Sequence, residues 1–320
     1  MTLAKATKQS VPPNMPLGVQ PSLRTGMIKT KDGANLRYAT CCDTARTRGT
    51  VCLFQGRRAY IERDYEIIED LRARGFSVAT LDWRGQGLSD RLLKDRLKGH
   101  IKSYKQYDLD LEAFMRQVVL PDCPPPYYGL AHSMGANVLL RSLQKSTWFE
   151  AAVMAAPFLG FSETKLPATI SHPVIKLLKA IGLGHLSLPG DFLSRKFESN
   201  VLTHDRERYE QQAEIIRGNP DLNVGGPTVS WLSASLDSHK QLASLKGSDA
   251  LRVPVLFVAA GDERVVSNEK IHAFSRNVAG TPVVTVENAY HEILLERDDM
   301  REQFFAAFDS FMDQHAPTKK

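Results

Sequence analysis

Short apolar segments alternate with helical segments along most of this chain, and that alternation leaves few folds open to it. Segments 50–54, 76–81 and 255–260 are mostly apolar and have the length of buried β-strands. Segment 62–74 has apolar residues at helical spacing and ends before Gly75. The other predicted elements are a hairpin at 26–40, strands at 127–131, 151–155 and 283–286, and helices at 104–120, 135–146, 268–277 and 298–314. The sequence therefore predicts an α/β fold with a mostly parallel, doubly wound sheet.

Residues 157–235 interrupt this alternation. They contain charged helical pieces, prolines and glycines, but no segment with the pattern of a core strand. A connection of this length is too long for an ordinary loop inside a compact domain. We therefore expect a helical cap inserted into a core made of residues 23–156 and 236–320. The proline-rich residues 1–22 are expected to form a flexible leader, or else an irregular arm packed on the core.

The composition argues against several classes of protein. A content of 42% hydrophobic and 24% charged residues is typical of globular proteins. The net charge of +5 is spread over mixed signs, so we predict no nucleic-acid partner. No window approaches the roughly 20 apolar residues of a membrane span, and residues 1–26 lack the apolar centre of a secretory signal. The four cysteines have neither metal-site nor redox spacing, which predicts reduced thiols and a cytoplasmic location. The sequence implies no metal and no organic cofactor, so none is expected.

One serine stands where a catalytic nucleophile is expected. In the run Ala131-His132-Ser133-Met134-Gly135, the serine lies between a predicted strand and a predicted helix. The G-x-S-x-G elbow has small residues two positions before and after the serine, because the turn between strand and helix is sharp. Ala131 replaces the first glycine and adds only a methyl group. The alternative is that Ser133 merely caps the following helix. His132 lies inside the turn and is predicted to be structural.

A serine nucleophile needs a base, and the base needs a carboxylate to orient it. In α/β sheets of this kind the chain order is serine, acid, histidine, at the carboxyl ends of the strands. Asp262 and Glu263 follow the predicted strand 255–260, and His291 follows the strand 283–286. The sequence therefore predicts His291 as the base and leaves the two adjacent carboxylates as candidates for the acid.

The oxyanion of the reaction needs two N–H donors. The first is the N–H of Met134, directly after the serine. The second is expected in the loop after the first buried core strand, where Gly56 allows a close approach of the backbone. We therefore predict the N–H of Arg57 as the second donor.

These motifs together resemble the α/β-hydrolase superfamily. Within it, the chain is similar to the lysophospholipases and monoacylglycerol lipases, also described as serine-aminopeptidase-like hydrolases. The resemblance extends over residues 27–313. The segments that carry it are 53–57, 73–76, 82–89, 131–135, 261–266 and 289–292.

The resemblance implies a serine hydrolase that cleaves carboxylic esters through an acyl-enzyme. Its pattern places the acid directly before a segment like Arg264-Val265-Val266, which selects Glu263 and keeps Asp262 as the alternative. Three positions depart from the pattern: Gln55, where the group usually has histidine, Ala131, and Glu263, where aspartate is common.

The substrate expected from the resemblance is a small acyl ester, either a lysophospholipid or a monoacylglycerol. Lysines lie on one side of the apolar segment 173–181 of the cap, which would suit contact with the inner face of a membrane; the alternative is a helix packed on the core. Two other functions stay open. One is a hydrolase of small peptides or amides on the same fold, and the other is a catalytically silent binding protein.

Overall fold

A computed structural model describes residues 23–43, 47–162, 168–189, 193, 196–278 and 281–316. The predicted leader lies outside the described residues. Within them, eight strands form one sheet in the order β1-β2-β4-β3-β5-β6-β7-β8. The strands are β1 Arg24–Lys29, β2 Asn35–Cys41, β3 Thr50–Phe54, β4 Ser77–Leu81, β5 Tyr127–His132, β6 Ala151–Ala155, β7 Val255–Ala260 and β8 Val283–Val286.

The first two strands pair antiparallel, as the predicted hairpin requires, and β2 pairs antiparallel with β4. All later pairs are parallel. Because parallel neighbours need a crossover, helices connect them. The longer helices are α1 Tyr65–Ala73, α2 Lys105–Phe114, α4 Met134–Leu143, α5 Ala168–Ala180, α6 Arg206–Gly218, α7 Val229–Ala243, α8 Asn268–Asn277 and α9 Asp298–His315. The predicted α/β class is confirmed.

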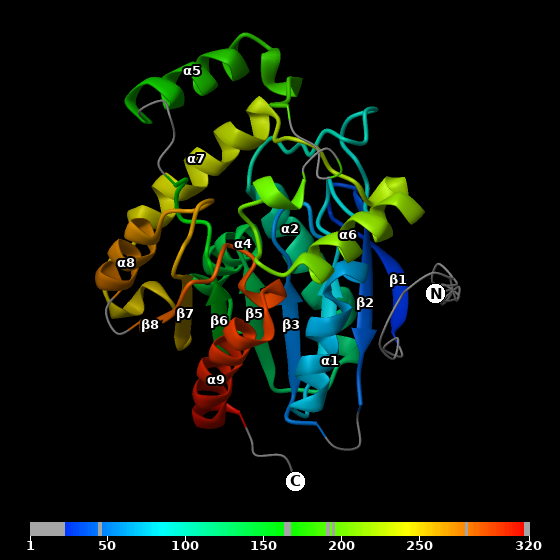
Figure 1. Cartoon of the computed structure of the whole chain (residues 1–320), viewed down its shortest axis with the longest axis vertical. Coiled ribbons are helices and arrows are strands. Elements are labelled where there is room, and N and C mark those ends of the chain that lie inside the picture. The colour runs from blue at the N-terminus through cyan, green and yellow to red at the C-terminus, as the bar shows by residue number, and fades with distance from the viewer. Residues whose placement is uncertain are drawn as a thin grey trace.

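Two apolar cores lie on opposite faces of the sheet. Helices α1 and α9 cover one face, where Phe304 and Phe308 are fully buried. Helices α2, α4 and α8 cover the other face, around Phe54 and Phe114. Figure 1 shows α9 and α1 in front of the strands and α5, α6 and α7 beyond one end of the sheet.

Two predicted elements differ in detail. The predicted helix 104–120 is interrupted: α2 ends at Phe114, a π-helical turn covers Met115–Val119, and α3 covers Leu120–Asp122.

The predicted cap boundary at residue 235 falls inside α7, so a division there would cut a helix. Between β6 and β7 the described residues contain helices and 3-10 turns but no strand. We propose that the cap includes all of these helices and ends after α7.

The segment between β6 and β7 presents an apolar surface. Helix α5 lies outermost, against α7 (Figure 1). Leu177 is 62% exposed, and Val174 and Ile181 lie on the same helical face at spacings of three and four residues from it. Among the described residues, no helix combines the length and the apolarity needed to cross a bilayer.

Candidate active site

Ser133 lies at the sharp turn between β5 and α4. Its backbone has φ 50° and ψ −114°, a conformation that costs energy for a residue with a β-carbon. Two glycines allow the turn to pack. A β-carbon on Gly135 would lie 2.3 Å from the carbonyl oxygen of Phe54, and one on Gly56 would lie 2.6 Å from Nδ1 of His132. This is the nucleophile-elbow geometry, and the Ser133 side chain makes no helix-capping hydrogen bond.

The structure brings Ser133, His291 and Glu263 into one hydrogen-bonded chain. The Oγ of Ser133 lies 2.9 Å from Nε2 of His291, and Nδ1 of His291 lies 2.8 Å from Oε2 of Glu263. With the imidazole proton on Nδ1, the ring donates to the carboxylate and its Nε2 accepts from the hydroxyl. This arrangement allows His291 to take the Ser133 proton.

The two adjacent carboxylates face in different directions. Oε1 of Glu263 accepts hydrogen bonds from the N–H groups of Val265, at 2.7 Å, and Val266, at 3.1 Å. Asp262 instead pairs with Arg264 at 2.6 Å, and its side chain is 48% exposed. The structure therefore brings Glu263, and not Asp262, to His291.

Burial and charge have opposite effects on the pKa values of Glu263 and His291. Burial favours the neutral form of Glu263, but the positive charge of His291 and the hydrogen bonds from His291, Val265 and Val266 outweigh it, so the pKa of Glu263 is lowered. Burial likewise lowers the pKa of His291, but the charge of Glu263 and its hydrogen bond reverse that effect and raise it. An imidazolium formed at His291 is thus stabilised by an ionised Glu263.

His132 lies under His291, with ring centroids 4.9 Å apart. Its Nε2 donates a hydrogen bond of 3.1 Å to the carbonyl oxygen of His291. Burial lowers the pKa of His132 to about 4, although the charge of Glu292 acts against it. A neutral histidine bonded to the backbone suits a positioning role, as the sequence predicted for it.

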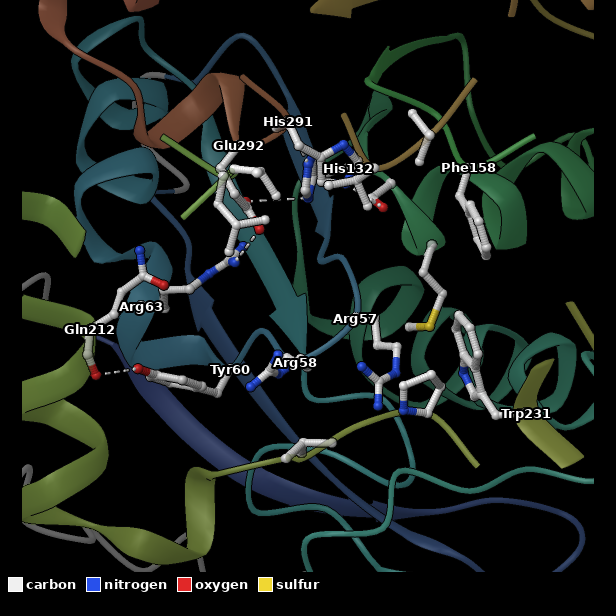
Figure 2. A pocket seen from close by; sticks show the side chains of 18 of the residues that line it. Arg57, Arg58, Tyr60, Arg63, His132, Phe158, Gln212, Trp231, His291 and Glu292 are labelled. Atoms are coloured by element: carbon white, nitrogen blue, oxygen red, sulfur yellow. Dashed lines mark hydrogen bonds and ion pairs between the residues drawn. The ribbon is translucent and has the colours of Figure 1, made fainter. Parts of the chain in front are cut away.

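Arg63 and Glu292 form a buried ion pair beside the site, and sequence reasoning missed it. Arg63 Nη1 lies 3.1 Å from Glu292 Oε1, and Arg63 also pairs with Asp64. Burial raises the pKa of Glu292, but the charge of Arg63 outweighs it and brings the value to about 2. The carboxylate therefore stays ionised, and Figure 2 shows it between Arg63 and the two histidines. No sequence pattern links residues 229 positions apart.

Two N–H groups are predicted for the oxyanion, and the loop just before Arg57 passes close to the serine: a β-carbon on Gly56 would lie 3.3 Å from Cβ of Ser133. Met134 begins α4, where the first N–H groups have no partner within the helix. The loop that holds Arg57 is fixed by Gln86, whose Nε2 donates to Gly56 and whose Oε1 accepts from the N–H of Arg58. The Arg57 and Met134 roles stay proposals. Gln55 is not among the residues that line the cavity, and its Nε2 lies 3.4 Å from Oγ1 of Thr80.

A cavity of about 240 Å³ opens beside Ser133 and His291 (Figure 2). Apolar side chains of the core and of the segment between β6 and β7 line much of it, among them Met134, Phe158 and Trp231. Such a mostly apolar pocket with a few polar groups is typical of a small-molecule site. Among the described residues, no three histidine, cysteine or acidic side chains are grouped so that they could hold a metal ion.

Residues 45–298 of the chain match the family model of the serine aminopeptidases, S33. The chain belongs to this family. This S33 member is 35% identical to lysophospholipase L2 of Escherichia coli strain K12 over 261 residues, which cover 78% of this chain and 76% of the relative. It is 27% identical to the probable lysophospholipase L2 of Haemophilus influenzae over 274 residues, 83% of this chain and 84% of the relative.

Solved structures share the fold of this S33 member. A soluble variant of monoglyceride lipase from Saccharomyces cerevisiae has a TM-score of 0.74 at 17% identity, covering 95% of this chain and 99% of that one. A carboxyl esterase from Bacillus coagulans has a TM-score of 0.70 at 19% identity, covering 92% and 98%. The α/β-hydrolase fold and the resemblance to serine-aminopeptidase-like hydrolases, both predicted from the sequence, are confirmed.

Proposed function

We propose that this protein is a carboxylic ester hydrolase that acts on lipid-like acyl esters through a serine-bound acyl intermediate. The observation that carries the proposal is the hydrogen-bonded chain from Glu263 through His291 to Ser133, which opens into a largely apolar cavity. The likeness to lysophospholipase L2 supports a lysophospholipid substrate, and the fold of monoglyceride lipase is compatible with a monoacylglycerol.

In the proposed reaction, His291 takes the proton of Ser133 while Oγ attacks the ester carbonyl carbon. The N–H groups of Met134 and Arg57 stabilise the negative charge that forms on the carbonyl oxygen. The tetrahedral intermediate collapses, the ester C–O bond breaks, and His291 gives its proton to the departing alcohol. His291 then removes a proton from water, which attacks the acyl-enzyme, and the carboxylic acid leaves as Ser133 recovers its proton.

The alternative of peptide or amide hydrolysis meets an electrostatic difficulty. A substrate with a free N-terminal amine brings a positive charge that needs a carboxylate partner. Among the described residues that line the cavity, Glu292 is the carboxylate, and Arg63 already pairs with it. The cavity also contains the positively charged Arg57, which repels an ammonium group.

A substrate panel tests the proposed function. We expect hydrolysis of 1-palmitoyl lysophosphatidylglycerol or 1-palmitoylglycerol at rates at least ~100-fold above those for leucine p-nitroanilide, because the cavity suits an acyl chain and repels an amine. Fatty acid release and nitroaniline absorbance measure the two reactions. Faster cleavage of the anilide would favour the amide hydrolase instead. If the protein hydrolyses no member of the panel, the proposal fails and the silent binding protein becomes the better hypothesis.

We also propose that α5 contacts a lipid surface. Val174, Leu177 and Ile181 are 48%, 62% and 61% exposed on one side of this helix and its end, and an apolar stripe of this kind inserts at a membrane interface. The predicted location, cytoplasmic and peripheral at the inner face of a membrane, stays a proposal with it.

Flotation with liposomes that contain anionic lipid tests this contact. The Leu177→Asp variant should lose on the order of tenfold in lipid affinity, because it removes an apolar side chain and adds a charge. Met27→Asp is the matched control, since Met27 is exposed on the edge strand β1, which lies on the other side of the molecule from α5 (Figure 1). Equal flotation of both variants and the wild type would contradict the proposed contact.

A further inference from the structure

The guanidinium of Arg57 lies in the active-site cavity, and no described residue of the chain provides a carboxylate partner for it. Its Nη2 donates a hydrogen bond of 2.6 Å to the carbonyl oxygen of Gly225, and its carbon lies 5.2 Å from the ring centroid of Trp231. Its Nε is buried and has no hydrogen-bond partner in the described part of the chain. A buried cation loses its hydration, so such groups are normally paired with anions.

Arg57 keeps its positive charge at neutral pH. Burial is the main cause that lowers its pKa, and the charge of Arg58 adds to the effect, which brings the pKa to about 9. Other buried arginines of this protein are paired with carboxylates, as this rule requires. The paired examples are Arg37 with Glu62 and Asp82, Arg63 with Asp64 and Glu292, and Arg84 with Asp32 and Asp110. Arg57 differs from them because it faces the substrate cavity.

Arg58 is a second arginine that lines the cavity beside Arg57. Its backbone has φ 71°, a left-handed conformation that side chains with a β-carbon rarely adopt. Both guanidinium groups line the cavity, and Figure 2 shows them on its side away from His291. Because Arg63 and Glu292 neutralise each other, no carboxylate among the described residues that line the cavity is left to neutralise Arg57.

The surroundings of Arg57 hold its guanidinium in position. A β-carbon on Gly99 would lie 3.3 Å from Nη2 of Arg57, so Gly99 leaves the space that this group occupies. Gly99 belongs to the core, whereas Gly225 and Trp231 belong to the segment between β6 and β7. The guanidinium is thus fixed between two parts of the chain, and its Nε is a donor that no described residue accepts from.

We propose that Arg57, with Arg58 beside it, binds the phosphate of a lysophospholipid head group, so that the enzyme prefers phosphate-bearing acyl esters to uncharged acylglycerols. This inference rests on the proposed function and names its substrate class. A planar guanidinium matches phosphate oxygens in geometry as well as charge. Arg57 also contributes its N–H to the proposed oxyanion site, so the phosphate would lie near the scissile ester, as the glycerol backbone of a lysophospholipid requires.

The test compares two substrates with the same acyl chain. The ratio of kcat/KM for 1-palmitoyl lysophosphatidylglycerol to that for 1-palmitoylglycerol should fall about 10- to 100-fold in Arg57→Gln, the loss expected for one charge-assisted hydrogen bond. Any disturbance of the oxyanion site cancels in the ratio, because both esters use it. Arg57→Lys keeps the charge but not the planar fork, and should give an intermediate ratio.

Arg264→Gln is the matched control, since Arg264 lies near the triad but does not line the cavity. It removes one positive charge and should leave the ratio unchanged. An unchanged ratio in Arg57→Gln would overturn the inference while leaving ester hydrolysis intact. An equal fall of the ratio in Arg264→Gln would also overturn it, because the ratio would then depend on the net charge of the protein and not on the position of Arg57. If the wild type hydrolyses neither ester, the proposed function fails.

Calorimetric binding of sn-glycerol 3-phosphate gives a readout that does not need catalysis. The wild type should bind it at least ~10-fold more tightly than Arg57→Gln does. Inorganic phosphate, titrated in parallel, distinguishes a head-group site from a site for free anions. Equal affinity of the wild type for both ligands, or equal affinity of wild type and Arg57→Gln for glycerol 3-phosphate, would contradict a head-group subsite.

Discussion

Replacing Ser133 with alanine is expected to lower kcat for acyl esters by a factor on the order of 10⁴ to 10⁶ and to abolish labelling by a fluorophosphonate probe. The variant lacks the oxygen that forms the acyl-enzyme, so the remaining donors can only polarise the ester for attack by water. In the structure, the Ser133 hydroxyl bonds to His291. Because this contact lies within the active site and joins no two strands or helices of the apolar cores, removing the hydroxyl should leave the fold intact.

The control for this variant is Ser142→Ala. Ser142 also belongs to α4, but its hydroxyl bonds to Ser146 and does not line the cavity. This variant should keep the wild-type rate and the probe labelling, and both proteins should have the circular dichroism of the wild type. Undiminished labelling of Ser133→Ala would show that another residue reacts, and the assignment of the nucleophile would be wrong.

Local sequence patterns predicted much of the fold. The elements β8 and α8 have the predicted bounds because turn residues and caps mark their ends, such as Ser267, whose side chain accepts from the N–H of Lys270. The π-helical turn after Phe114 was not predicted. Apolar spacing shows which face of a helix is buried, but it does not show which carbonyl each N–H will reach.

The candidate site was predictable where chain order and strand ends determine position. Ser133 and His291 each follow a core strand, so the sheet brings them to the same edge. The choice between Asp262 and Glu263 needed the family pattern, since the direction of adjacent side chains depends on the backbone of the loop. The Arg57 side chain could not be placed from sequence, because its partners Gly225 and Trp231 come from the segment between β6 and β7.

The adjacent carboxylates provide the sharpest test of the triad. Glu263→Gln should lower kcat by a factor of about 10³ to 10⁴, because the amide can no longer hold the imidazole in the required tautomer or stabilise its cation. Asp262→Asn should leave kcat within about twofold of the wild type, since Asp262 pairs with Arg264 at the surface. The reverse ranking would make Asp262 the acid and the observed hydrogen bond between Glu263 and His291 incidental.

The pH profile of Glu263→Gln separates a role in catalysis from a merely structural one. In the wild type, Glu263 raises the pKa of His291 above its ordinary value of about 6.5, so activity should fall as the pH decreases through that raised value. In Glu263→Gln the carboxylate charge is gone while the burial of His291 remains, which lowers the imidazole pKa. The acid limb of the residual activity should therefore move to lower pH, whereas in Asp262→Asn it should stay at the wild-type position. A structural defect would reduce the amount of active protein at every pH and leave the limb unmoved, and that result would contradict the proposed coupling between Glu263 and His291.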